Sequence, residues 1–466
     1  MSGGRGRHRL APAVGALALA LAAGAQQAAG PAARGLSLRE AVTIALAHSP
    51  RLRAAQAEES AARAAVGEAA AGRRPQVETS EGFTRSDNPV SVFGTLLSQQ
   101  RFTVADLALN QLNHPAPLNN YATRVAVGVP LFDARQAELR TREARLGVKA
   151  AASASEQARQ GVVAAVVNAY YRLAAEEAGV RIARSAAAEA ASSLHQAQAR
   201  YRAGMAVQAD ALRAQVYAAQ AEEALAAAQG QAEVARAGLN QAMGRDQATP
   251  VPLPPDADDA QAGVAPEAAS LAALLEAAQR RRPELQAERN RLAAARAEVT
   301  RAQAAFLPTL EGAAAWEHDQ WRFANGGGSN WTLGLTLRWT PYSGGRRRAA
   351  LQAALAAERR ETARSAELRQ GVEMEVREAW QAGVTAAQQA RIARQAAAQA
   401  AAALTIERNR YTSGLATITE LLGAETALTQ AQNQALEARY ALAVSAANRA
   451  LAAGELSATA VTGATR

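Results

Sequence analysis

The chain has 466 residues, a formal net charge of +9 and no cysteine. The lack of cysteine excludes disulfides, thiolate metal sites, cysteine nucleophiles and a lipid anchor on an N-terminal cysteine. The positive charge comes from arginines that are interleaved with Glu and Gln and form no patch, so nucleic-acid binding is not expected.

Residues 1–25 have the pattern of a secretory signal peptide. Arg5, Arg7 and Arg9 form a basic start, residues 10–23 an apolar segment, and residues 23–25 an Ala-Gly-Ala cleavage site. The processed chain is therefore expected outside the cytoplasm. No later stretch approaches about 18 apolar residues free of charge, so membrane contact is expected to come from strands, an attached lipid or a surface patch.

The rest of the chain is an internal duplication. The segment around Pro50 recurs around Pro283, and Arg74-Pro75-Gln76-Val77 recurs as Leu307-Pro308-Thr309-Leu310 at the same offset. The extra length of the first half falls in a long loop at residues 85–120. The expected organisation is a first repeat at 26–244, a Pro-rich linker at 245–266, a second repeat at 267–453 and a tail at 454–466.

Each repeat is expected to contain the same elements in the same order. A short amphipathic helix leads through a proline into a second helix, then two strands, a very long helix and a return helix. In the first repeat these are residues 37–48, 50–73, 76–84, 121–132, 133–200 and 205–243, and in the second 267–281, 283–306, 309–317, 331–340, 345–410 and 418–453.

The long helices predict an elongated molecule. At 1.5 Å per residue each spans about 100 Å, which no compact domain holds. The hydrophobic fraction of 49% is mostly alanine and aromatic residues make up 4%, which favours helices packed at close range. In each half the second helix and the return helix are expected to lie end to end against the long helix. The leftover segments would form a belt at the joint.

The strand at 331–340 alternates without interruption. Trp331, Leu333, Leu335, Leu337 and Trp339 share one face, and the other face is polar or small. At about 3.3 Å per residue the two tryptophans lie about 26 Å apart, which suits a lipid-facing strand with an anchor at each interface. Tyr121 is a third expected anchor, and an ordinary edge strand on a soluble core is the alternative. Four strands cannot close a membrane barrel and an open edge is not tolerated in lipid, so several copies are expected to share one barrel.

The signal, the duplicated halves, the strand pairs followed by very long helices and the Tyr-x-x-Gly tips resemble the TolC-like outer-membrane efflux protein family (outer membrane factor). The resemblance implies a mainly α fold with a small transmembrane β part, assembled as a homotrimer. A shared 12-stranded β-barrel in the outer membrane would cap an α-barrel tunnel across the periplasm. It also implies an exit duct of a tripartite efflux or type I secretion system, working with a periplasmic adaptor and an inner-membrane transporter of RND or ABC type.

The resemblance places the aperture and the adaptor contact at the helix tips. Gly204 and Gly414 would form the tip turns, where an αL residue is needed. The expected aperture residues are Tyr201, Asp210, Tyr411 and Glu420. The alternatives are that the tyrosines only cover helix ends and that the carboxylates only favour the helix dipole.

Two positions depart from the pattern of the family's best-known aperture. That aperture has a second acidic residue one turn after the first, where this chain has Gly423. An arginine that locks the closed tip is replaced by Ala416.

No signature of an enzyme or of a cofactor site is present. The histidines lack ligand spacing, and residues 326–328 lack the lysine and hydroxyl of a phosphate loop and are expected to form a hairpin loop. The apolar loop at 85–120 is expected either to fold over the outer mouth or to be disordered. The rival functions are a periplasmic adaptor, against which the duplication argues, and a secreted structural coiled coil, which would not need the strand pairs.

Overall fold

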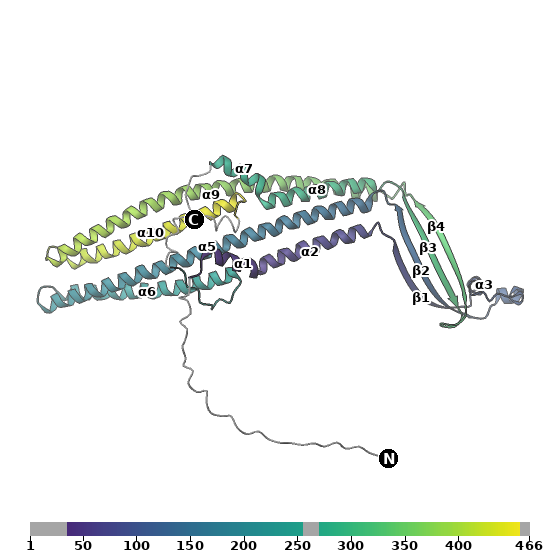
Figure 1. The fold of residues 1–466 in the computed structure, drawn as a ribbon, viewed down its shortest axis with the longest axis horizontal. Helices are drawn as coiled ribbons and strands as arrows, with labels where there is room; N and C mark the ends of the chain where they lie inside the picture. Colours follow the sequence, from purple (N-terminus) through teal and green to yellow (C-terminus); the bar gives the residue numbers. More distant parts are fainter. Residues whose placement is uncertain (1–34, 255–269, 457–466) are drawn as a thin grey trace, which may run out of the picture.

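The computed structural model describes residues 35–254 and 270–456. The expected signal peptide lies outside these residues, as do parts of the linker and of the tail. The molecule is elongated, with a small sheet at one end and two long helical hairpins that end at the other (Figure 1). In the described ranges, no helix is both long enough and apolar enough to cross a membrane.

The helices follow the expected order in both halves. The first half contains α1 (Leu38–His48), α2 (Pro50–Ala71), α5 (Gln136–Arg202) and α6 (Gln208–Met243). The second contains α7 (Leu271–Arg281), α8 (Pro283–Ala304), α9 (Arg346–Thr412) and α10 (Ile418–Ala452). The two prolines occupy the first positions of α2 and α8, where a missing N–H costs nothing.

The return helix expected from residue 205 begins at Gln208. Two other helix starts differ from the sequence-based boundaries for reasons visible in the caps. The helix expected from residue 267 begins at Leu271, because the Ser270 side chain accepts the amide of Ala273 as an N-cap. The helix expected from residue 133 begins at Gln136. Ala134 and Arg135 have φ of 54° and 64°, and Asp133 Oδ2 accepts the Ala137 amide at 2.7 Å.

The four strands form one antiparallel sheet in the order β1-β2-β3-β4. They are β1 (Gln76–Ser86), β2 (Leu118–Phe132), β3 (Thr309–Gln320) and β4 (Gly328–Arg338). Each repeat contributes two neighbouring strands, so the two halves meet between β2 and β3. The register shifts at Pro130, which has no N–H to give to the ladder. Within the chain β1 and β4 are edge strands.

The segment between β1 and β2, expected as a long loop, is folded. It contains α3 (Pro89–Ser98), the 3-10 helix η1 (Val104–Leu107) and α4 (Leu109–Asn113), and α3 lies beyond the end of the sheet that is farthest from the long helices (Figure 1). The buried Gln99 side chain ties this segment to the strands. Its Nε2 donates to Asn119 O at 2.8 Å and to Asn120 Oδ1 at 2.9 Å.

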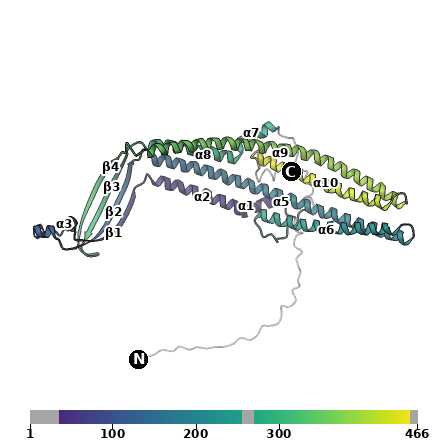
Figure 2. The ribbon, with the colours of Figure 1, turned by 180° about the vertical axis from the view of Figure 1, so that it is seen from behind.

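The long helices carry the shorter ones along their length. Helices α2 and α6 lie end to end against α5, and α8 and α10 do the same along α9 (Figure 2). At the first joint α1 packs on α5, with Val42 against a buried run that includes Val163, Val166 and Leu173. The Tyr170 hydroxyl donates to Leu36 O at 3.1 Å. The largest buried apolar cluster of the described residues therefore lies at this joint, about midway between sheet and tips, and smaller clusters lie at the second joint and near the tips.

Candidate functional site

The two helix tips are built in the same way. Gly204 has φ of +71° and Gly414 has φ of +78°, a conformation that side chains rarely adopt. In the first tip the Met205 amide donates to Arg200 O at 2.9 Å, and in the second the Leu415 amide donates to Arg410 O at 2.8 Å. These bonds satisfy carbonyls at the ends of α5 and α9 and reverse the chain.

The two tip tyrosines have different surroundings. Tyr411 is 4% exposed and lies under the Arg200 guanidinium, 4.3 Å from its ring centre, whereas Tyr201 is 43% exposed. Burial raises the pKa of the Tyr411 hydroxyl, and the nearby charges of Arg200 and Asp210 act on it in opposite directions. The structure therefore buries Tyr411 beneath Arg200, within range of the charge of Asp210, and leaves Tyr201 exposed.

Arg200 connects the two tips. This role was not predicted from the sequence. Besides stacking on Tyr411, its Nη2 donates to Thr412 O at 2.9 Å, so a side chain of α5 holds the end of α9. Both tips have an arginine directly before the tyrosine, and this repeated pair is the sequence feature that could have pointed to Arg200. Arg410, the counterpart of Arg200, pairs instead with Glu407 at 2.8 Å within its own helix.

The two tip carboxylates are engaged in their own helices. Asp210, in the first turn of α6, lies 3.3 Å from Arg213. Glu420 closes a capping box at the start of α10, where the Thr417 amide donates to Glu420 Oε2 at 2.7 Å and the Thr417 hydroxyl at 2.9 Å. These hydrogen bonds lower the pKa of Glu420. Its side chain remains exposed, so its charge is present at the tip surface.

The sheet carries one largely apolar face, which a polar row of Ser329, His318, Thr123 and Glu81 crosses near the loop end. Residues directly opposite each other share a face, and the register aligns Trp331 with Trp316, and Trp316 with Val125. The next apolar row aligns Leu333, Ala314, Val127 and Val77. The opposite face is small or polar and includes an ion pair between Arg124 and Glu317 at 3.5 Å. The apolar side chains of the last strand segment are 62% exposed or more: Trp331, Leu333, Leu335, Leu337 and Trp339.

The expected anchors lie at different levels of this face. Trp339 follows β4 at the helix end of the sheet, and its Nε1 donates to Phe306 O at 3.3 Å. Trp331 lies toward the loop end, beside Trp316, which the sequence reading missed because β3 alternates weakly. Tyr121 lies farther toward the loops than the tryptophan pair and packs against Phe83 at 4.8 Å between ring centres.

A family model described as "Outer membrane efflux protein" matches residues 41–245 and 274–455. The chain belongs to this family. The resemblance inferred from the sequence is thereby confirmed at the level of the family. A curated relative, Protein CyaE of Bordetella pertussis, is 35% identical over 281 residues, which cover 59% of this chain and 53% of that protein. The match thus spans about half the length of that relative.

Solved structures share the fold of this efflux protein. VceC, an outer membrane protein of Vibrio cholerae, has a TM-score of 0.74 at 21% identity, over 90% of this chain and 96% of that one. The open state of the MtrE outer membrane channel of Neisseria gonorrhoeae has a TM-score of 0.73 at 18% identity, over 90% and 89%. CusC, whose structures concern transmembrane channel formation, has a TM-score of 0.77 at 19% identity, over 90% and 92%. These matches confirm the mainly helical fold with a small antiparallel β part.

One buried and one half-buried carboxyl group were not expected from the sequence. Near the tips Glu425 of α10 is 3% exposed and accepts the Ser193 hydroxyl of α5 at 2.7 Å. Burial raises the pKa of Glu425. It lies in an apolar run of α10, and a charge within such a run was the signal that could have identified it. An ion pair of Arg408 with Glu189, at 3.3 Å, lies close enough for both charges to act on Glu425.

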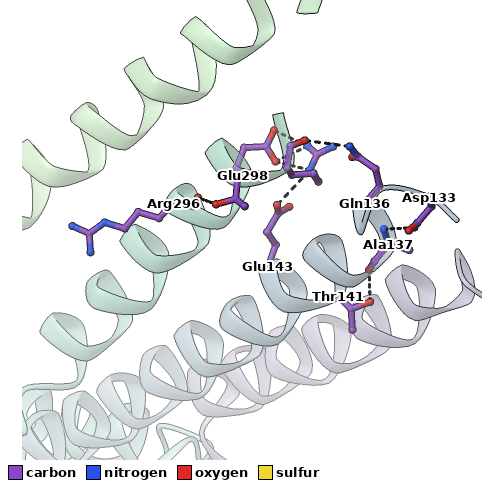
Figure 3. Close-up of polar contacts among 9 residues, drawn as sticks. Asp133, Gln136, Ala137, Thr141, Glu143, Arg296 and Glu298 are labelled. Atoms are coloured by element: carbon purple, nitrogen blue, oxygen red, sulfur yellow. Dashed lines mark hydrogen bonds and ion pairs between the residues drawn. The ribbon is translucent and has the colours of Figure 1, made fainter. Parts of the chain in front are cut away.

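The second carboxyl group lies where the helices approach the sheet. Glu143 of α5 and Glu298 of α8 point toward the same region between the two helices (Figure 3). Arg301 joins them, with its Nε 3.3 Å from Glu143 and 2.8 Å from Glu298. Burial and the charge of Glu298 raise the pKa of Glu143. This three-residue cluster couples α5 to α8 close to the ends of both helices.

Proposed function

We propose that this efflux protein is the outer-membrane exit duct of a tripartite efflux or type I secretion system. The observation that carries the proposal is a sheet with one largely apolar face and two open edges, mounted on helices about 100 Å long. The apolar face suits lipid, and the helices are long enough to extend far into the periplasm.

The open edges support assembly as a homotrimer. Because the four strands alternate in direction, β4 runs opposite to β1, so β1 of one copy can pair in antiparallel fashion with β4 of the next. Three copies close a barrel of twelve strands, within the range of membrane barrels, and leave no edge in lipid. Closed cyclic symmetry is the usual arrangement for such an assembly. The helical hairpins then continue the barrel as a tunnel.

The tips are proposed as the periplasmic aperture. Threefold symmetry would place three copies of Glu420 and three of Asp210 around one axis, and rings of carboxylates favour cations. Arg200, stacked on Tyr411, holds the two hairpins of each copy together and is proposed to keep the aperture narrow. The turns at Gly204 and Gly414 would contact a periplasmic adaptor, which joins the duct to an inner-membrane transporter.

Reconstitution in planar bilayers tests the proposal. The purified protein is expected in outer-membrane extracts as a heat-sensitive oligomer, and the oligomer is expected to conduct ions. A periplasmic adaptor or a structural coiled coil would appear in the soluble periplasmic fraction and would give no conductance. Recovery in that fraction without any conductance would overturn the proposal.

A further inference from the structure

The segments that join the helices to the sheet carry exposed positive charge. Four exposed arginines, here called the junction arginines, lie in the α2–β1 connection and in the first turn of α9: Arg73, Arg74, Arg346 and Arg348. None forms an ion pair with another described residue. Arg347, between the last two, differs because it donates to Thr340 O.

The carboxylates nearby are already engaged. Glu138 pairs with Arg135 at 2.8 Å, and Asp133 accepts the Ala137 amide. Arg73 follows Gly72, whose backbone lies beside Ala137 in the first turn of α5, and its charge helps to lower the pKa of Glu138. The junction therefore keeps an excess of positive charge after its local pairs are counted.

Exposed aromatic and apolar side chains lie at the same end of the sheet. Trp339 is 62% exposed and Tyr342 is 83% exposed, and Phe306 and Leu307 are exposed at the end of α8. Trp and Tyr at such positions are typical of the boundary between acyl chains and headgroups. A surface that combines such aromatic side chains with arginines is suited to contact with lipid headgroups.

The strand order brings the junction arginines of different copies together. Arg73 and Arg74 precede β1, and Arg346 and Arg348 follow β4, so each pair belongs to one edge of the sheet. In a closed barrel these edges meet along a seam, the line where β1 of one copy pairs with β4 of the next. Four like charges then gather at the helix end of every seam, where they repel one another unless an anion lies between them.

We propose that the junction arginines bind the phosphate group of an anionic phospholipid at each seam, in the leaflet that faces the helices. This inference rests on the proposed function, since the seam exists only in the closed assembly. Arginine suits the role because its planar fork donates two hydrogen bonds to one phosphate. The bound lipid screens the repulsion between copies and stabilises the oligomer.

The test measures the temperature at which the purified oligomer dissociates in neutral detergent. Phosphatidylglycerol is expected to raise this temperature more than phosphatidylcholine does. The variant Arg74→Gln/Arg346→Gln should lose at least about half of the phosphatidylglycerol effect, because binding to the native state sets the shift. The matched control Arg359→Gln/Arg394→Gln removes the same charge from exposed positions farther along α9 and should keep the effect.

Three results would overturn the inference: equal shifts with both lipids, an equal loss in both variants, or the same stabilisation by inorganic phosphate. A different result would contradict the proposed function. In that case the unaltered protein forms no heat-sensitive oligomer, with or without lipid.

Discussion

Arginine at position 335 should prevent assembly, because Leu335 lies at the middle of the apolar strand face. It is four residues from Trp331 and four from Trp339, is 70% exposed, and lies opposite Gly312 in the register. In the proposed barrel this side chain points into lipid near the midplane. An arginine there costs roughly 2 to 4 kcal/mol per chain. In a symmetric trimer the cost arises three times, roughly 6 to 12 kcal/mol in all.

The neighbouring position provides the matched control. Thr336 lies on the opposite face of β4, across from Glu311, so an arginine there meets a carboxylate instead of lipid. The yield of heat-sensitive oligomer in outer-membrane extracts, measured on gels, should fall strongly for Leu335→Arg and mildly for Thr336→Arg. Equal yields for the two variants would refute the assignment of faces.

Three further predictions concern the tips. Glu420→Gln keeps the capping box and should lower cation selectivity in planar bilayers, with only a small loss of stability from the lost charge in the first turn. Unchanged selectivity would mean that the carboxylate only caps α10. Arg200→Gln should raise the conductance, whereas Arg202→Gln, at an exposed position, should not; equal conductance would remove Arg200 from the gate. The raised pKa of Glu425 means that the folded state holds its proton at pH values where the unfolded state has lost it. The contribution of Glu425 to the free energy of unfolding therefore falls as pH rises from about 4.3 through the pKa of Glu425 in the folded state. Glu425→Gln should raise the melting temperature at neutral pH and not below about pH 4, and a gain that does not depend on pH would contradict this reasoning.

The element order could be read from the sequence because duplication and proline placement act locally. Pro50 and Pro283 mark helix starts whatever the tertiary structure. The alternation of residues 331–340 likewise determines which side chains share a face, and the register extends that face across the sheet. The Ala-rich middle of β3 has no such contrast, so Trp316 was missed. The folded segment around α3 depends on the anchor at Gln99, whose partners lie on other strands.

The tip contacts were harder to predict for a different physical reason. The stacking of Arg200 on Tyr411 depends on how α5 and α9 are rotated about their axes relative to each other. Because alanine is frequent in both helices, the sequence pattern does not identify this rotation clearly. The hydrogen bond between Ser193 and Glu425 depends in the same way on the relative rotation of α5 and α10. Sequence comparison of the two repeats found the glycine turns, since both repeats need them, but not contacts that only one repeat makes.

The central claim is that β1 of one copy pairs with β4 of the next in a closed ring of three. The chain contains no cysteine, so pairs can be introduced without background. Thr79→Cys in β1, combined in turn with a cysteine at each position from Thr332 to Leu337 in β4, should form disulfides between copies in native membranes. Adjacent strands lie close enough for such a bond at the positions in register. The account predicts cross-linked dimers and trimers and no larger species. Cross-links that continue beyond the trimer, or none at any position, would contradict it.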